Sequence, residues 1–112
     1  MFNVHSKLGP GLLESIYEEA LMCEFEEAKI PFKTQIFYPV VYNNKLLNKE
    51  FRLDFLIDNQ LILEIKSIEA INDVHKKQLL TYLKITNLKL GLLVNFNVSH
   101  LKDGITRIVN NL

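Results

Sequence analysis

Three charged residues interrupt two otherwise apolar segments of the sequence. Asp54 lies in FRLDFLID, and Glu64 and Lys66 lie in LILEIKS. Alternate residues of a β-strand face the same side, so Glu64 and Lys66 are expected on one face of their strand. Two carboxylates with a lysine beside them are groups that hold a divalent cation, activate a water molecule or steady a phosphate. These three residues therefore form the first candidate site.

The register between the two strands decides whether the two acids meet. If residues 58–60 form a three-residue hairpin loop, Ile57 pairs with Leu61 and Asp54 stands opposite Glu64 on the same face. A two-residue loop would place the acids on opposite faces. The three-residue loop is thus an assumption of the prediction.

Opposed carboxylates repel each other, and half-burying them raises the cost. A divalent cation would remove that penalty. Asp54 and Glu64, with a nearby backbone carbonyl such as that of Ile65, offer the hard oxygen ligands that suit Mg²⁺ or Mn²⁺. The alternative is an ion-pair cluster without a metal, in which Arg52 and Lys66 neutralise the acids.

Two helices are expected to cover the charged strands. The first comprises GPGLLESIYEEALMCEFEEAKIPF, with its start at Pro10 and its end before Pro31. Its expected apolar stripe extends to Ala28 and contains Leu13, Ile16, Tyr17, Ala20 and Leu21. On a helical wheel Glu14 lies at the flank of this stripe, whereas Glu18 and Glu19 face further out. The second helix is NDVHKKQLLTYLKI, with Asn72 or Asp73 as N-cap.

The second helix carries His75, Gln78 and Tyr82 on one face, because their spacing is i, i+3 and i+7. Packed beside the charged strands, it would aim Gln78 and Tyr82 at the acids. The alternatives are that Tyr82 is a core aromatic and that His75 has a polar surface role near the start of the helix.

The other segments complete the order α-β-β-β-α-β-α, an α/β fold with a mixed central sheet flanked by helices. Turns are expected at Asn43-Asn44 and Asp58-Asn59, and Pro39 marks an edge strand or a bulge. LKLGLLVNF is expected to be a buried fourth strand, and SHLKDGITRIVNN a short final helix. Residues 1–112 are expected to form a single domain.

Composition narrows the functional classes. The net charge is zero, but residues 1–28 hold six glutamates and one lysine, which leaves the remainder mildly basic and able to form a local basic groove. Cys23 is the only cysteine, so one chain has neither a disulfide nor a cysteine-based zinc site. The sequence shows no signal peptide and no apolar segment long enough to span a bilayer, which favours a cytoplasmic protein.

The segment GLLESIY, which is Gly11-x-x-Glu14-x-x-Tyr17, resembles the signature of the GxxExxY family. The segments around Asp54, around Glu64-Ile65-Lys66, and HKKQLLTYLK and LGLLVNF resemble that family in the same order. The family is placed in the PD-(D/E)XK nuclease superfamily, which implies a restriction-endonuclease-like core.

The resemblance also implies roles for single residues. Asp54 and Glu64 would bind the metal, Lys66 would be the catalytic lysine, and Glu14 would add a further acid to the metal site. Gln78 and Tyr82 match a QxxxY motif that helps position the lysine and the DNA. Leu53 stands where the motif's name has proline.

Three functions follow as hypotheses. The first is a metal-dependent nuclease that cleaves nucleic acid, with DNA as the expected substrate and a homodimer as the expected assembly. The second is a catalytically inactive nucleic-acid-binding or interaction module of the same fold. The third is an α/β domain whose charges form an internal ion-pair network.

Overall fold

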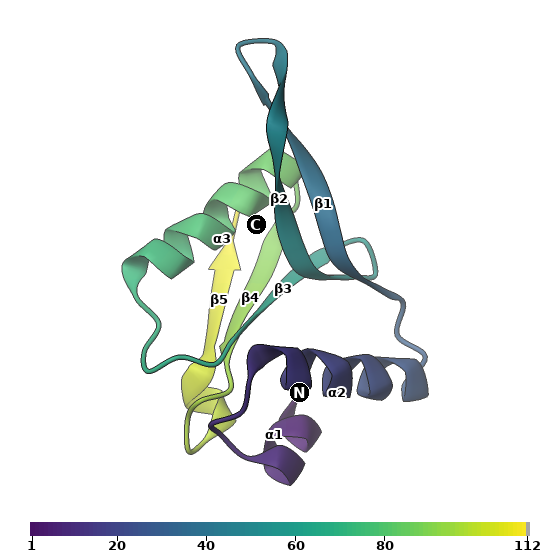
Figure 1. The fold of residues 1–112 in the computed structure, drawn as a ribbon, viewed down its shortest axis with the longest axis vertical. Helices are drawn as coiled ribbons and strands as arrows, with labels where there is room; N and C mark the ends of the chain where they lie inside the picture. The colour runs from purple at the N-terminus through teal and green to yellow at the C-terminus, as the bar shows by residue number, and fades with distance from the viewer. Residues whose placement is uncertain (112) are drawn as a thin grey trace.

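The computed structural model describes residues 1–111 (Figure 1). The elements, in chain order, are α1 (Phe2–Leu8), α2 (Glu14–Glu27), β1 (Phe32–Tyr42), β2 (Lys45–Ile57), β3 (Leu61–Lys66), α3 (Asp73–Thr86), β4 (Leu90–Asn95), the 3₁₀ turn η1 (Leu101–Gly104) and β5 (Ile105–Val109).

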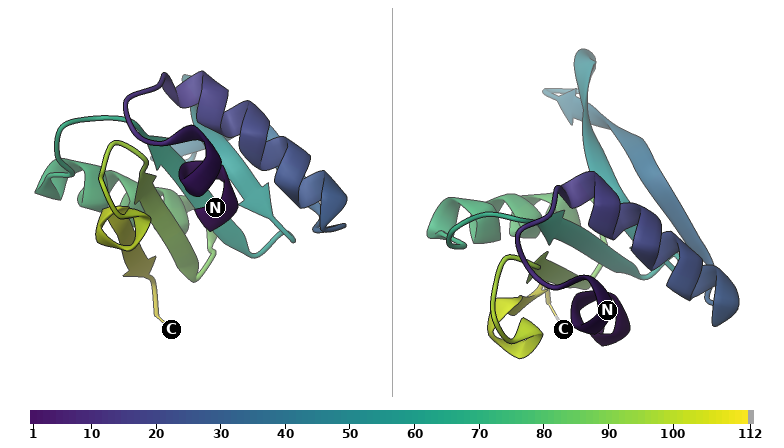
Figure 2. Two further views of the ribbon diagram at one scale, coloured as in Figure 1. Left: turned by 90° about the horizontal axis from the view of Figure 1, so that it is seen from below. Right: turned by 60° about the horizontal axis from the view of Figure 1, so that its bottom comes forward.

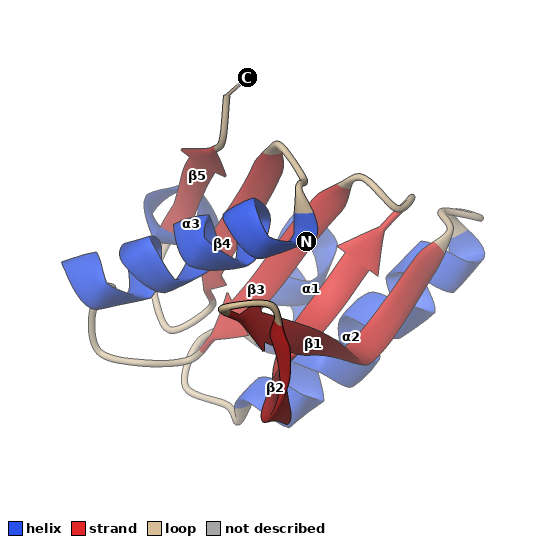
Figure 3. Cartoon of the chain, turned by 90° about the horizontal axis from the view of Figure 1, so that it is seen from above, coloured by secondary structure: helices blue, strands red, loops and turns tan. Residues whose placement is uncertain are grey.

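The five strands form one mixed sheet in the order β1-β2-β3-β4-β5. β3 and β4 are parallel, and the other neighbouring pairs are antiparallel. α3 forms the crossover between the parallel strands and covers one face, while α1 and α2 lie on the other (Figures 2 and 3). The predicted α/β class, with a mixed sheet flanked by helices, is confirmed.

Each face of the sheet has its own core. Tyr17 and Leu21 of α2 pack with Phe55, Leu63 and other apolar residues on one face. Leu79 and Leu83 of α3 pack on the opposite face with three core residues of the strands, which are Leu53, Ile62 and Leu93. Burying a leucine of this kind is worth roughly 1.5–3 kcal/mol, so both helices are firmly held.

The two turns and the N-cap of the second helix are confirmed. Asn43 and Asn44 both have positive φ, as a tight hairpin turn requires, and Asn72 caps α3. β1 is an edge strand with a register shift between Pro39 and Val41, so both interpretations of Pro39 hold.

One helix near the N-terminus was not predicted, and two predictions for α2 are wrong. Residues 2–8 form a helix that the pattern did not indicate, and α2 begins at Glu14 rather than at Pro10, because Gly11 has a positive φ of 91°. Leu13, expected in the apolar stripe of this helix, is 71% exposed.

The predicted C-terminal helix is instead η1 followed by β5. The ITRIV segment pairs with β4 along its length, and this tertiary pairing outweighs the helical local pattern. Gly104 permits the tight approach, since a Cβ there would clash with the carbonyl of Asn95.

Beyond the sheet, β1 and β2 continue as a two-stranded ribbon. Pairing of β2 with β3 extends only from Ile57↔Leu61 to Phe55↔Leu63, whereas pairing of β1 with β2 continues to Tyr42↔Lys45. The segment from Phe37 to Arg52, called the arm below, projects from the body of the molecule (Figure 1). The point where β2 parts from β3 is called the fork.

Candidate active site

The two acids lie at the fork. Ile57 pairs with Leu61, which confirms the assumed loop of residues 58–60 and makes Asp54 and Glu64 the next facing positions beyond the last ladder pair. Both side chains are buried, with Asp54 7% and Glu64 6% exposed. The predicted opposition of the acids therefore rests on a confirmed register.

The carboxylates replace the missing ladder hydrogen bonds. The Asp54 N–H donates to Glu64 Oε2 at 2.8 Å, and the Ile65 N–H donates to Asp54 Oδ2 at 2.9 Å. Each side chain thus bonds to the backbone of the opposite strand. This exchange fixes both carboxylates in the fork and satisfies amides that would otherwise be buried without a partner.

The strand changes faces at Asp54. Leu53 packs in the α3-side core and Phe55 in the α2-side core, although residues two apart normally share a face. Opposite Asp54, Gln35 of the edge strand has a positive φ of 48°. The distortion turns the Asp54 carboxylate out of the regular sheet and into the fork.

Burial and repulsion shift the ionisation of Glu64. Desolvation, followed by the negative charge of Asp54, raises the pKa of Glu64 from 4.5 to about 8. The Arg52 guanidinium lies 3.4 Å from Asp54 Oδ1, but its side chain is half exposed and its attraction is correspondingly weak. In the absence of a cation the site holds a proton on one acid near neutral pH.

Lys66 lies at the end of β3, paired with Asn95 of β4. Its charge lowers the pKa of Glu64, though less than burial raises it. Within residues 1–111 its ammonium makes no ion pair within 4.0 Å. The ion-pair alternative is thus met for Arg52 and Asp54 and not for Lys66, whose half-buried ammonium is uncommitted.

Asn95 holds the chain that follows Lys66. Its side chain is buried, accepts the Ile68 N–H at 3.1 Å and donates to the Ile68 carbonyl at 3.0 Å. The sequence analysis did not single out this residue. An asparagine at the carboxyl end of a buried strand was the available signal.

The Gly11-x-x-Glu14-x-x-Tyr17 segment builds the start of α2. The buried Tyr17 hydroxyl donates to the Gly9 carbonyl at 2.6 Å and accepts the Leu12 N–H at 3.1 Å. Glu14 Oε2 accepts the Ser67 N–H at 3.3 Å. The segment therefore joins the start of α2 to the chain just beyond Lys66.

Glu18 lies beside the candidate site, which the sequence analysis did not expect. It is half-buried, and its pKa is raised by desolvation and then by the charge of Asp54. The expectation that it faces further out is wrong. Glu14 and Glu18 are one helical turn apart and lie on the same side of α2, toward the fork.

Of the helix-face residues, Tyr82 approaches the acids. Burial and then the charges of Glu64 and Asp54 raise its pKa, and its ring stacks on Phe51 at 4.4 Å between centroids. Gln78 is exposed, and its side chain makes no hydrogen bond to the acids in the described part of the chain.

His75 caps the start of α3 instead of reaching the acids. Its Nδ1 accepts the N–H of Asn72 at 3.1 Å while the Asn72 side chain accepts the N–H of His75 at 3.1 Å. These reciprocal bonds form a capping box. The surface role is the correct interpretation of His75.

The donor chemistry of the fork fits a hard divalent cation. Asp54 and Glu64 are two buried carboxylates, and a cation would offset the burial and the mutual repulsion that raise the pKa of Glu64. Among residues 1–111, however, no three acids, histidines or cysteines are already grouped as a metal site. Glu14 is engaged with Ser67, so the expected convergence of three acids is absent from this arrangement.

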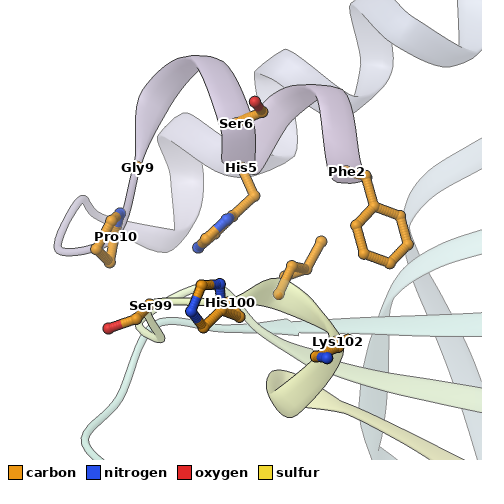
Figure 4. Close-up of a pocket in the computed structure, with 9 residues that line it drawn as sticks. Phe2, His5, Ser6, Gly9, Pro10, Ser99, His100 and Lys102 are labelled. Carbon is orange, nitrogen blue, oxygen red and sulfur yellow. The ribbon is translucent and has the colours of Figure 1, made fainter.

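A separate cavity of about 570 Å³ lies between α1 and the Ser99–Lys102 segment (Figure 4). His5 lines it and donates from Nε2 to the Val98 carbonyl at 2.7 Å, which fastens α1 to this segment. None of its lining residues is a predicted site residue. The helices of residues 1–111 include none with the length and apolar character needed to cross a membrane.

Comparison with known proteins identifies the family. No curated protein and no solved structure matches the chain significantly. A family model described as the PD-(D/E)XK nuclease superfamily matches residues 1–108. The mixed sheet, flanking helices and restriction-endonuclease-like order of elements agree with that match. The chain belongs to the PD-(D/E)XK nuclease superfamily.

Proposed function

We propose that this protein is a metal-dependent nuclease that hydrolyses phosphodiester bonds of nucleic acid, with DNA as the expected substrate. The observation that carries the proposal is the buried pair of Asp54 and Glu64 at the fork, with the uncommitted Lys66 on the same strand as Glu64. We assign the chain to the GxxExxY branch of the superfamily on Gly11, Glu14 and Tyr17.

Asp54 and Glu64 would hold Mg²⁺ or Mn²⁺, together with the Ile65 carbonyl. Such an ion supplies charge neutralisation at the phosphate and a water molecule of lowered pKa. Glu14 is held by one long hydrogen bond from the Ser67 N–H, at 3.3 Å. It is the candidate for a further metal ligand, as is Glu18 beside it.

The remaining residues act on the substrate side. Lys66 would stabilise the negative charge that develops on the phosphate or take a proton from the attacking water. Tyr82 would orient the acids and a phosphate oxygen through its hydroxyl, held in place by the stack with Phe51. Gln78, one turn earlier and exposed, would contact the nucleic acid strand.

The test is cleavage of labelled single-stranded and duplex DNA and RNA with Mg²⁺ or Mn²⁺. Wild type is compared with Lys66→Ala and with Lys7→Ala, which removes an exposed lysine of α1. Loss of a charge-stabilising or proton-transferring group costs roughly 100-fold or more, so Lys66→Ala should cut at least about 100-fold more slowly. Equal rates for wild type and Lys66→Ala on every substrate would contradict the proposal.

A second candidate is an inactive nucleic-acid-binding module. It is favoured by the hydrogen bonds that both fork carboxylates already make to backbone amides, which give them a structural role without a metal. Metal-independent binding of nucleic acid, with unchanged affinity in Asp54→Ala, would support this candidate.

A homodimer and a cytoplasmic location are part of the nuclease proposal, and both are predictions from the sequence.

A further inference from the structure

The arm has no role in the chemistry proposed for the fork. Residues 45–50 are exposed at every position, so this end of the ribbon has water on both faces. A two-stranded ribbon without a packed face is at best marginally stable in water. A ribbon of this length is therefore expected to gain a partner when the protein functions.

The two faces of the arm differ near its base. On one face Tyr38 stacks on Phe51 at 5.6 Å, and Phe51 stacks on Tyr82 of α3 at 4.4 Å. On the other face Phe37 is 65% exposed. It has no aromatic partner among residues 1–111. One face is thus fastened to the body, and the other presents a bare ring.

The bare ring lies next to the fork. Phe37 is the ladder partner of Arg52, so the two side chains share a face. Arg52 reaches back along β2 to Asp54 Oδ1, at 3.4 Å. Phe37, Arg52 and Asp54 therefore form a continuous row from the arm to the carboxylates.

The charges of the arm and of α2 indicate which kind of molecule binds along this row. The arm carries Lys45, Lys49 and Arg52 against one acid, Glu50. On the body beside it, every charged side chain of α2 is a glutamate. A polyanion approaching the fork would be attracted by the arm and repelled by α2, which orients it along the arm.

The shape of the edge argues against a second copy of the chain as the partner. Pairing along β1 would need an unbroken row of backbone donors and acceptors. Pro39 has no N–H, and the register shift between Pro39 and Val41 bends the edge. These two features protect the β1 edge of the arm from edge-to-edge pairing and leave its faces available.

We propose that the arm binds a single-stranded segment of nucleic acid that wraps around the ribbon, with Phe37 stacked on an unpaired base on one face and Lys45 and Lys49 paired with phosphates on the other face. An exposed aromatic ring stacks on an unpaired base, whereas the bases of a duplex are already covered by their neighbours. This inference rests on the proposed nuclease function and narrows its substrate to single strands or to duplexes with unpaired ends.

The test is binding of fluorescent single-stranded DNA and RNA 12-mers and of the matching duplex, in EDTA at low salt, followed by anisotropy. We expect the single strands to bind more tightly than the duplex. Phe37→Ala should weaken single-strand binding about tenfold, the usual effect of removing one stacking ring, and Phe37→Tyr should stay near wild type. Phe2→Ala, which removes a ring 58% exposed on α1, is the matched control and should leave the affinity unchanged.

The lysines give an independent readout. Lys49→Ala should reduce the slope of log affinity against log salt concentration by about 0.7, the value for one phosphate contact on a single strand. Lys7→Ala on α1 should not change that slope. A loss of slope confined to the arm variant supports the assignment of phosphates to the arm.

Four results would overturn the inference: no binding of any single strand, tighter binding of the duplex, equal affinities for Phe37→Ala and Phe2→Ala, or a stable dimer that Phe37→Ala dissociates. Failure of the nuclease proposal looks different. Tight single-strand binding that depends on Phe37, with no cleavage in Mg²⁺ or Mn²⁺, would remove the catalytic function and keep the arm. Cleavage by wild type, with no effect of Phe37→Ala on binding, would keep the nuclease function and exclude single-strand binding by the arm.

Discussion

Asp54 and Glu64 exchange hydrogen bonds across the point where β2 leaves β3, each carboxylate accepting an N–H from the opposite strand. The pair closes the end of the ladder and at the same time buries two negative charges in one place. Structural and chemical roles therefore meet in the same two side chains.

Without metal, wild type should lose stability as the pH rises from about 5 to 8. The pKa of Glu64 is raised to about 8 in the folded protein, against 4.5 for the free side chain, so the folded state holds the extra proton in this range. Stability from such a group is complete below the lower pKa and is lost on passing through the higher one. The limiting slope for one proton is about 1.4 kcal/mol per pH unit.

Urea unfolding in EDTA between pH 5 and 8.5 measures that slope. Glu64→Gln keeps an oxygen acceptor for the Asp54 N–H and removes the ionisation of Glu64, so its stability should fall less steeply with pH than that of wild type and should exceed it at pH 8.5. Glu19→Gln, on the exposed side of α2, should follow wild type. Parallel curves for wild type and Glu64→Gln would show that Glu64 does not carry the buried proton.

Tyr17→Phe should destabilise the protein by roughly 1–3 kcal/mol, because it leaves the Gly9 carbonyl and the Leu12 N–H without their partner in a part-buried turn. The aromatic stack on Phe96 stays, so the change reports the hydroxyl alone. Chemical denaturation is the measurement, with Tyr42→Phe at the exposed turn of the arm as the control. A Tyr17→Phe variant as stable as that control would mean that the hydroxyl does not hold the start of α2.

Tyr82→Phe should slow cleavage by roughly tenfold or more, because it removes one hydrogen bond from the hydroxyl to the charged reacting groups. The thermal unfolding midpoint of this variant should equal that of wild type. Phenylalanine keeps the stack on Phe51, whereas Tyr82→Ala removes it and should lower stability as well. Rates and thermal midpoints of both variants distinguish the hydroxyl from the ring. A Tyr82→Phe enzyme with full activity would assign Tyr82 to packing only.

Much of the fork was predictable because it depends on short-range patterns. The three-residue loop after Ile57 sets the register, and the register brings Asp54 opposite Glu64. The point where β2 parts from β3 was not predictable, since both strands have continuous strand-like patterns. Tertiary packing on the two faces of the sheet decides where pairing ends.

The wrong predictions for α2 and for the C-terminal segment also arise from tertiary packing. The apolar residues of residues 13–28 suggested a stripe that included Leu13, but the buried face of α2 centres on Tyr17 and Leu21. That rotation brings Glu18 to the fork. At the other end of the chain, the local pattern of residues 105–109 indicated a helix, and only the neighbouring β4 makes it a strand.

The most direct test of the central claim is calorimetric titration of Mg²⁺ and Mn²⁺ into wild type, Asp54→Asn and Asp58→Asn. Asp54→Asn keeps the shape of the fork and removes one charge, and Asp58→Asn removes a charge from the exposed loop next to it. We predict that wild type and Asp58→Asn bind the ion equally and that Asp54→Asn loses binding by at least about tenfold. Equal binding by Asp54→Asn and wild type, or no binding by wild type with or without a nucleic acid strand, would contradict the assignment of the fork as a metal-dependent active site.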